Sequence, residues 1–312
     1  MRLKLAVLTF FAFFSAQAQQ PTETMEFRGE TLSVDVQRVN VLFTVANGKG
    51  KLITNLRRED FNVFEDDRLQ QISNFSTETD LPLNIAVLID SSGSVREKLR
   101  FEQQAATKFF HSAVRQGKDK VFIMSFDTAA TLLQDYTDDP ALLSQTLRKI
   151  IPGGATSLYD AVLEAAGKLA GQKGRRVIIV LSDGLDNSSH ASLAKTLETA
   201  QKEDVIVYTI STNSIDGDDP KEQKIGDASL KRLATETGGH AFVPAKMEEL
   251  LPAFLRINEE LRSQYSLAYG PTNANRDGTY RQIRVVGARK SFKIRCRTGY
   301  FAPGGDLALA GR

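Results

Sequence analysis

One carboxylate and two hydroxyls recur at alternate positions in Asp90-Ser91-Ser92-Gly93-Ser94, a segment of the form D-x-S-x-S. In a turning loop, residues at i, i+2 and i+4 can direct their side-chain oxygens toward one point. All three are hard oxygen donors, which suit Mg²⁺, with Mn²⁺ or Ca²⁺ as competitors, and do not suit zinc. Asp90 also ends an apolar run that is typical of a buried strand. Because ligands bind at the carboxyl ends of strands in open α/β sheets, the segment predicts a divalent-cation site.

Two later segments offer oxygen donors at the same expected edge of a sheet. Thr156 follows the pair Gly153-Gly154 and precedes a predicted helix, and Asp183 directly follows a predicted strand. We therefore expect one site built from three loops, with the members Asp90, Ser92, Ser94, Thr156 and Asp183. Mg²⁺ takes about six oxygens, so these donors, some acting through water, leave one coordination position for a carboxylate from another protein.

Ordinary structural explanations also exist for these segments. Serine-rich loops commonly follow strands without binding an ion, and Asp183 or Thr156 could cap a helix or a turn. Asp160, inside the helix after Thr156, is expected either to orient the Thr156 loop or to interact only with the helix dipole. Asp127, just past another predicted strand, lies on the same edge and is a second candidate for the outer shell.

The elements that must position these residues are those of an α/β fold. Short Val/Ile-rich runs, typical of strands buried on both faces, alternate with amphipathic helical segments. Strands are expected at 84–89, 120–126, 176–181, 204–210 and 240–243, with a short antiparallel edge strand at 131–134. Helices are expected at about 96–115, 140–150, 158–171, 191–202, 228–237 and 247–262. This alternation predicts a Rossmann-like, doubly wound, mostly parallel sheet.

Strand-like patterns flank this region on both sides. Residues 26–80 and 263–302 are rich in alternating and β-branched residues, and each segment is too short to form a good core alone. We expect them to pair in one β unit, with the α/β domain of residues 81–262 inserted between them. The segment 70–75 is expected to form one of the short strands, and residues 213–227 a solvated acidic insertion.

The first 18 residues have the pattern of a signal peptide. Arg2 and Lys4 precede the apolar run Leu5–Phe14, and Ala16-Gln17-Ala18 is a small-x-small cleavage signal. The run is too short to span a bilayer comfortably, and no second apolar segment is long enough. We therefore expect an exported protein, periplasmic, secreted or at the cell surface, with no transmembrane segment after signal removal.

Composition limits the classes of partner and cofactor. The 40 basic and 38 acidic residues give a net charge of only +2, so no nucleic-acid partner is expected. Cys296 is the single cysteine and cannot form an internal disulfide. The histidines, His111, His190 and His240, lack the spacing of a catalytic zinc site.

The region of about residues 82–262 resembles a von Willebrand factor type A (VWA) domain with a metal-ion-dependent adhesion site (MIDAS). The family pattern is D-x-S-x-S, a threonine in a second loop and an aspartate ending a later strand. This chain matches it at Asp90, Ser92, Ser94, Thr156 and Asp183. The resemblance implies a Rossmann-like VWA fold and an ion that bridges to an acidic residue of a protein ligand. With its flanking strands and the ending 297–301, the chain also resembles bacterial exported proteins related to this domain.

These patterns predict a divalent-cation-dependent protein-binding module, for adhesion or complex assembly, rather than an enzyme. A metal-dependent phosphohydrolase is one alternative, but Ser92 stands where such enzymes would place a second aspartate, two residues after Asp90. The chain also lacks a serine-nucleophile elbow and a phosphate-binding loop with lysine in the right context. The other alternative is a structural envelope protein that the ion only stabilises.

Overall fold

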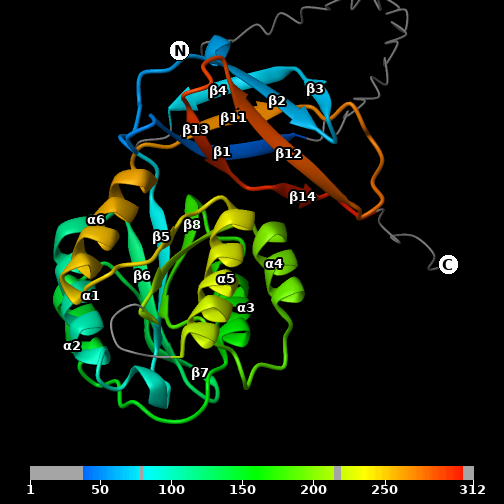
Figure 1. Cartoon of the computed structure of the whole chain (residues 1–312). Coiled ribbons are helices and arrows are strands. Elements are labelled where there is room, and N and C mark those ends of the chain that lie inside the picture. Colours follow the sequence, from blue (N-terminus) through cyan, green and yellow to red (C-terminus); the bar gives the residue numbers. More distant parts are fainter. Residues whose placement is uncertain (1–37, 78–79, 214–218, 305–312) are drawn as a thin grey trace, which may run out of the picture. The chain divides into compact units, whose positions relative to one another are not determined.

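Apolar runs in the middle of the chain form strands buried on both faces. In this computed structural model, which describes residues 38–77, 80–213 and 219–304, six strands form a sheet of order β10-β9-β8-β5-β6-β7 (Figure 1). The strands are β5 (Leu83–Asp90), β6 (Lys120–Phe126), β7 (Ala130–Thr137), β8 (Arg175–Ser182), β9 (Val205–Ser211) and β10 (Ala241–Phe242). All neighbouring pairs are parallel except β6 and β7. The predicted Rossmann-like, mostly parallel sheet is therefore confirmed.

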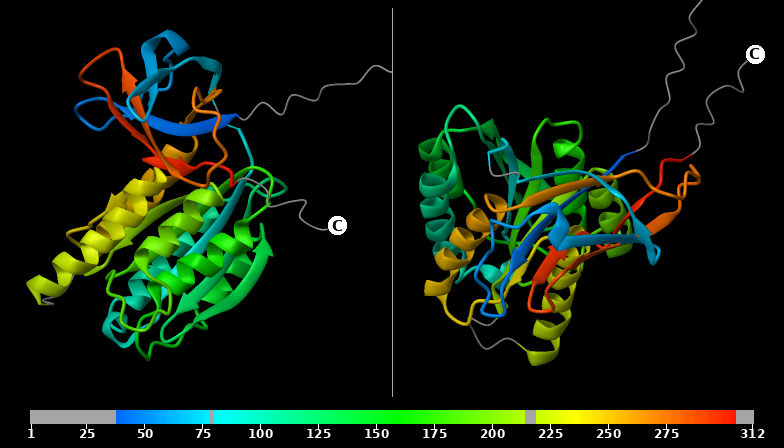
Figure 2. Two further views of the ribbon diagram at one scale, coloured as in Figure 1. Left: turned by 90° about the vertical axis from the view of Figure 1, so that its right-hand side faces the viewer. Right: turned by 90° about the horizontal axis from the view of Figure 1, so that it is seen from above.

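Helices cover both faces of this sheet (Figures 1 and 2). The helices are α1 (Leu99–Ala113), α2 (Pro140–Leu147), α3 (Leu158–Leu169), α4 (Leu193–Lys202), α5 (Pro220–Thr237) and α6 (Leu250–Leu261). On β5, Ile85 and Val87 belong to the core with α1, α2 and α6, whereas Ala86 and Leu88 belong to the core with α3, α4 and α5. Successive strand residues point to opposite faces, so a run buried on both must be apolar throughout.

The order of the strands reverses at β5. The chain passes from β5 through α1 to β6 on one side, and later through α3 to β8 on the other side. Near their carboxyl ends, β5 and β8 pair through Ile89 and Leu181. Residues that follow these two strands therefore meet at a topological switch point, where open α/β sheets bind ligands.

Segments from before and after the α/β part pair in two further sheets, of order β13-β1-β11-β4 and β14-β12-β2-β3. Their strands are β1 (Val39–Ala46), β2 (Phe61–Glu65), β3 (Arg68–Gln70), β4 (Ile72–Thr77), β11 (Tyr265–Tyr269), β12 (Tyr280–Gly287), β13 (Lys293–Cys296) and β14 (Gly299–Phe301). Val41 pairs with Leu267, and Val63 with Val285. The two sheets share one apolar core, in which Phe43, Phe61 and Tyr265 are in ring contact.

Three local predictions differ from the structure. Residues 70–75 do not form one strand, because the chain breaks between β3 and β4 at Gln71. The helix expected from residue 228 begins at Pro220, where Asp219 accepts a hydrogen bond from the Lys221 amide at 2.9 Å and caps the first turn. The expected acidic insertion is thus partly helical. The signal peptide and the start of the 26–80 region lie outside the described residues.

No helix in the described ranges is both long and apolar enough to cross a membrane.

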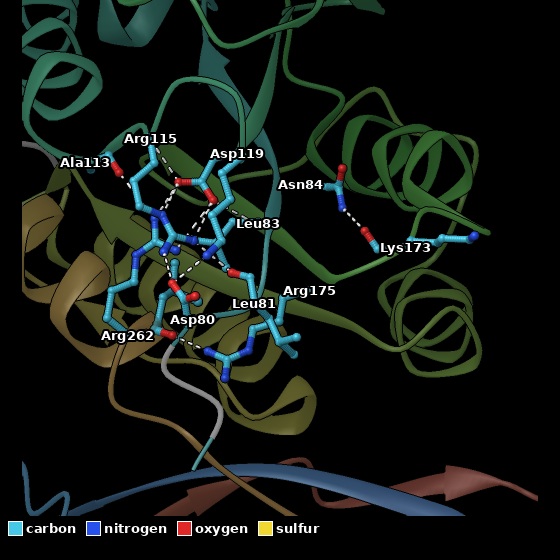
Figure 3. A network of polar contacts seen from close by, with 12 residues as sticks. Asp80, Leu81, Leu83, Asn84, Ala113, Arg115, Asp119, Lys173, Arg175 and Arg262 are labelled. Carbon is cyan, nitrogen blue, oxygen red and sulfur yellow. Dashed lines mark hydrogen bonds and ion pairs between the residues drawn. The ribbon is translucent and has the colours of Figure 1, made fainter. Parts of the chain in front are cut away.

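One buried carboxylate ties the start and the end of the α/β part together (Figure 3). Asp119, just before β6, accepts hydrogen bonds from the Leu83 amide at 3.0 Å and from Arg262 Nη2 at 2.6 Å. Arg115 bonds the same carboxylate through Nε at 3.1 Å and also pairs with Asp80 at 2.9 Å. Asp80 precedes β5 and Arg262 follows α6, so both connections to the flanking sheets are fixed at the amino edge of the central sheet.

This arrangement predicts a loss of stability in acid. Burial acts to raise the pKa of Asp119, but hydrogen bonds from Arg115 and Arg262 outweigh it and lower the pKa from 3.8 to about 2. A lowered pKa stabilises the fold above the unfolded value, and that contribution disappears as the pH falls from about 4 through 2. We expect Asp119→Asn to cost about 2 kcal/mol more at pH 5 than at pH 2 in urea unfolding. A cost that does not change with pH would contradict the ion-pair assignment.

Candidate metal centre

The loop after β5 brings three of the predicted ligands together. Asp90 Oδ1 accepts a hydrogen bond from the Ser92 amide at 2.9 Å, and the hydroxyls of Ser92 and Ser94 lie 3.0 Å apart. Ser94 Oγ then donates to Asp183 Oδ2 at 2.7 Å. Four of the five side chains therefore belong to one chain of hydrogen bonds that joins the ends of β5 and β8. Ser94 is exposed, whereas Asp90, Ser92 and Asp183 are buried.

A close contact with α5 fixes the turn that carries Asp183. Asp183 Oδ1 accepts a hydrogen bond from the Leu185 amide at 3.0 Å, and Gly184 has φ +81°. A Cβ atom on Gly184 would lie 2.3 Å from the Gly226 carbonyl oxygen, and one on Gly226 would lie 2.0 Å from the Asp183 carbonyl oxygen. Only glycine fits at either position, so the backbone of Asp183 is tightly constrained.

Thr156 lies in a loop that is tied to the D-x-S-x-S segment through the backbone. The Gly153 amide donates to the Ser91 carbonyl at 2.7 Å, and the Gly93 amide donates to the Gly154 carbonyl at 3.2 Å. Among the described residues, the buried Thr156 hydroxyl makes no hydrogen bond with the other four side chains. The structure thus brings the Thr156 loop to the site, while its hydroxyl stays outside the hydrogen-bonded chain.

Asp160 and Asp127 support the Thr156 loop rather than touching the other candidates. The Asp160 carboxylate accepts the amides of His190 and Ala191, both at 2.9 Å, and these bonds lower its pKa against the opposing effect of burial. The same 187–191 segment holds Thr156, whose amide donates to Asn187 Oδ1 at 2.8 Å. The Asp127 backbone carbonyl accepts the amide of residue 157 at 2.7 Å. The Asp160 carboxylate therefore contacts the segment that holds Thr156, whereas Asp127 contacts the Thr156 loop through its backbone.

Negative charge accumulates in the buried part of the site. Asp90 is completely buried, and this burial together with the charge of Asp183 raises the pKa of Asp90 to about 6. Hydrogen bonds from Ser182 and Ser92 oppose the rise, with Ser182 Oγ 2.5 Å from Asp90 Oδ2. A positive charge near Asp90 and Asp183 would relieve the repulsion between these carboxylates.

Glu102 on α1 adds a third carboxylate that the sequence analysis missed. It is completely buried, and neither carboxylate oxygen has a hydrogen-bond partner among the described residues. Burial first, and then the charge of Asp90, raise its pKa well above the usual range, while the buried Lys98 opposes the rise. Leu99, Glu102 and Ala106 follow helical spacing on the buried face of α1. The position of Glu102 on the apolar face of a predicted helix was the feature of the sequence that could have identified it.

Ser182 was also missed, although it is adjacent to Asp183 and ends β8. Its hydroxyl donates to Asp90 and accepts the Gly184 amide at 2.9 Å, so it holds both strand ends in register. The sequence could not predict this contact, because Ser182 and its partner Asp90 lie 92 residues apart.

The donor set fits a hard divalent cation. The described residues contain no group of three or more His, Cys, Asp or Glu side chains arranged to hold a metal. A cation at this site would be held by hydroxyl oxygens beside the two carboxylates. Asp90 and Asp183 supply charge, and Ser92, Ser94 and Thr156 supply neutral oxygens. The buried Glu102 carboxyl group, which has no hydrogen-bond partner among the described residues, interacts electrostatically with Asp90. Such oxygen-only sets suit Mg²⁺, Mn²⁺ or Ca²⁺.

Comparison with known proteins agrees with this architecture. Residues 85–185, which include most of β5 and all of β6, β7 and β8, match the model of the von Willebrand factor type A domain family. A search of curated proteins found no match. All five candidate ligands lie within the matched residues, and Asp183 lies close to the end of the match.

Solved structures are similar in fold. Proximal thread matrix protein 1 from the mussel byssus, with a zinc occupied MIDAS motif, is 18% identical with a TM-score of 0.50, covering 63% of this chain and 50% of that chain. The vWF domain of the type V pili tip protein Mfa5 from Porphyromonas gingivalis is 15% identical, with a TM-score of 0.46, 57% of this chain and 94% of that one. BatB from Bacteroides thetaiotaomicron is 15% identical, with a TM-score of 0.45, 57% of this chain and 99% of that one.

Proposed function

We propose that this chain is an exported, non-enzymatic protein-binding module, for adhesion or complex assembly, that acts through a divalent cation. Asp90, Ser92, Ser94, Thr156 and Asp183 would hold Mg²⁺, with Asp160 and Asp127 orienting the Thr156 loop. The bound ion would supply a strong electrostatic attraction for an acidic side chain of the partner. Mn²⁺ or Ca²⁺ would substitute where available.

The observation that carries this proposal is the hydrogen-bonded chain from Asp90 through Ser92 and Ser94 to Asp183. It gathers oxygens from two strand ends at the switch point of the sheet, where the buried carboxylates of Asp90 and Asp183 repel one another. Ser94, the exposed member of this chain of hydrogen bonds, gives solvent and therefore a partner access to the site.

The proposed organisation is a signal peptide at 1–18, a β region at 26–80, the VWA domain at 81–262 and a second β region at 263–302 that completes the first. Strand pairing between the two β regions supports the insertion. Export follows from the leader pattern of Arg2, Lys4 and the apolar run after them.

A capture experiment tests the binding function. The chain without residues 1–18 is immobilised and incubated with the exported protein fraction of its source cells, in Mg²⁺, in Zn²⁺ or in EDTA. We expect a protein that wild type retains in Mg²⁺, that EDTA releases, and that Asp90→Ala does not retain. Circular dichroism confirms that the variant is folded. An identical set of captured proteins in every arm would refute the proposal.

The two alternatives give different results in the same preparation. A phosphohydrolase would turn over a phosphoester such as p-nitrophenyl phosphate only when Mg²⁺ is present. A structural protein would lose thermal stability strongly in EDTA while retaining no partner in any arm. The capture experiment includes Zn²⁺ because the mussel byssus protein is described with a zinc occupied MIDAS motif.

A further inference from the structure

A hollow on the outer surface of α1 and α2 is lined by positive charge. It has a volume of about 380 Å³ and is lined by Arg100, Gln103, Gln104, Thr107, Lys108 and Arg148. Three of these six residues are cationic and none is acidic. We refer to it below as the cationic hollow.

The cations of this hollow lack counter-ions. Across residues 38–77, 80–213 and 219–304, Arg100, Lys108 and Arg148 take part in no ion pair or side-chain hydrogen bond. In contrast, the hollow beside β14 contains Lys202 and Arg297, which pair with Glu198 at 2.5 Å and Asp204 at 3.0 Å. Unpaired, exposed cations that line one concave surface create a local positive potential, although the whole chain is nearly neutral.

The cationic hollow is built from helices that adjoin the loops of the proposed metal centre along the chain. α1 begins at Leu99, five residues after Ser94, and Arg148 immediately follows α2 on the way to the Thr156 loop. Gln103 Nε2 donates to the Leu147 carbonyl at 2.9 Å and joins the two helices. Arg96 Nη2 donates to the Pro152 carbonyl at 3.3 Å and joins the two loops. From Arg100 to Lys108 the charges extend about 12 Å along α1.

We propose that the cationic hollow binds an acidic stretch of the same protein partner whose carboxylate the ion takes. This inference rests on the proposed function and specifies the partner: a polypeptide with further Asp or Glu residues beside the one at the ion. Side-chain amides of Gln103 and Gln104 can bond the partner's carboxylates or backbone. Glu97, the exposed carboxylate nearest in sequence to α1, is not part of the lining.

Synthetic peptides test this proposal. One peptide contains a single glutamate among Gly, Ser and Ala, and two others carry three additional aspartates before or after that glutamate. Binding is measured by fluorescence anisotropy in Mg²⁺ and in EDTA. Because each exposed charge contact contributes modestly, three of them together should tighten binding of one extended peptide by about tenfold at low salt. This gain should decrease as the ionic strength rises.

Charge reversal assigns the gain to the hollow. Arg100→Glu combined with Arg148→Glu should remove the tenfold gain while leaving Mg²⁺-dependent binding of the single-glutamate peptide measurable. The matched control combines Lys120→Glu with Lys231→Glu, which reverses two exposed, unpaired cations on β6 and α5. An extended peptide that binds no tighter than the short one, or an equal loss in both double variants, would overturn the proposal.

The same experiment separates this inference from the proposed function. If the single-glutamate peptide fails to bind in Mg²⁺, ion-mediated capture is refuted. Binding of the extended peptides in EDTA then tests whether the cationic hollow binds acidic peptides by itself. If wild type binds an extended peptide in EDTA and the Arg100→Glu/Arg148→Glu variant does not, the cationic hollow is a docking surface for acidic peptides. Equal binding by wild type and the variant overturns the proposal. Polyphosphate that binds the hollow when no peptide does would assign it to a different class of anion.

Discussion

Replacing Asp90 by asparagine should abolish Mg²⁺ binding and, at the same time, make the ion-free protein more stable. The two effects have one cause. Asp90 is completely buried and its pKa is raised from 3.8 to about 6, so near pH 7 its negative charge opposes folding in the absence of a cation. Asparagine keeps the acceptor for the Ser92 amide but removes the charge. We expect a gain on the order of 2 kcal/mol, or about 5 °C in Tm.

Ion binding should change in the opposite direction. Loss of groups that merely orient metal ligands costs about 10- to 100-fold in affinity, so loss of a charged ligand should cost at least about 100-fold. An ion that binds only the folded state raises its Tm in proportion to the logarithm of its concentration. Wild type should therefore gain Tm as Mg²⁺ is added, and Asp90→Asn should not. Calorimetric titration with Mg²⁺ gives the affinity directly.

Glu102→Gln is the matched control for this experiment. It also replaces a buried carboxyl group that interacts electrostatically with Asp90 and has no hydrogen-bond partner among the described residues, but Glu102 is not among the proposed ligands. It should not lower the Tm of the ion-free protein, and Mg²⁺ binding should remain measurable. If Asp90→Asn keeps wild-type affinity, Asp90 is not a ligand. If it lowers the ion-free Tm, the carboxylate is stabilising and the electrostatic argument is wrong.

Replacing Arg281 by alanine should cause the largest loss of stability, about 3–5 kcal/mol, because it leaves a buried charge without its partner. Arg281 and Glu65 lie in the shared core of the two flanking sheets, with exposures of 1% and 2%, and their charged groups are 3.6 Å apart. The hydroxyls of Tyr269 and Tyr300 donate to Glu65 Oε2 at 2.8 and 3.0 Å. Arg281 also donates to the backbone carbonyls of Asn273 and Asn275, so its loss removes two hydrogen bonds that hold the loop between β11 and β12.

Urea unfolding of four variants checks this explanation: Arg281→Ala, Arg284→Ala, Glu65→Gln and the double variant Glu65→Gln/Arg281→Ala. Arg284→Ala, on the same strand β12, removes an exposed pair with Asp67 and should cost no more than about 1 kcal/mol. Glu65→Gln added to Arg281→Ala should recover part of the lost free energy of unfolding, because it removes the uncompensated carboxylate. Losses that simply add in the double variant would show that the two side chains do not interact.

Much of the α/β part could be predicted from the sequence because its signals are local and repeated. A run that is apolar at consecutive positions, such as residues 121–124 of β6, has few alternatives to a buried strand. The placement of Asp90 and Asp183 at neighbouring strand ends follows from the same reasoning, since parallel strands end at one edge. The metal role of these residues stays a prediction that the Asp90 experiments test.

What could not be predicted depends on contacts between distant residues. The sequence alone gives Glu102 the appearance of an ordinary helical glutamate. Only the packed structure shows that its carboxylate is buried and has no hydrogen-bond donor among the described residues. Gly184 and Gly226 are 42 residues apart in number, and only the close approach of their backbones explains both glycines. The early start of α5 was missed because its first turn is exposed, so the apolar spacing used to recognise helices begins later.

The position of the Asp119 network has a mechanical consequence. The chain joins the flanking sheets at the amino edge of the central sheet, and the D-x-S-x-S loop follows β5 at its carboxyl edge. A pulling force between a captured partner and the flanking sheets would therefore run lengthwise through β5. This strand is bonded on both sides, to β6 and to β8, along seven residue pairs each. Extracting it would require shearing both ladders at once rather than unzipping them pair by pair, a geometry suited to bearing tension.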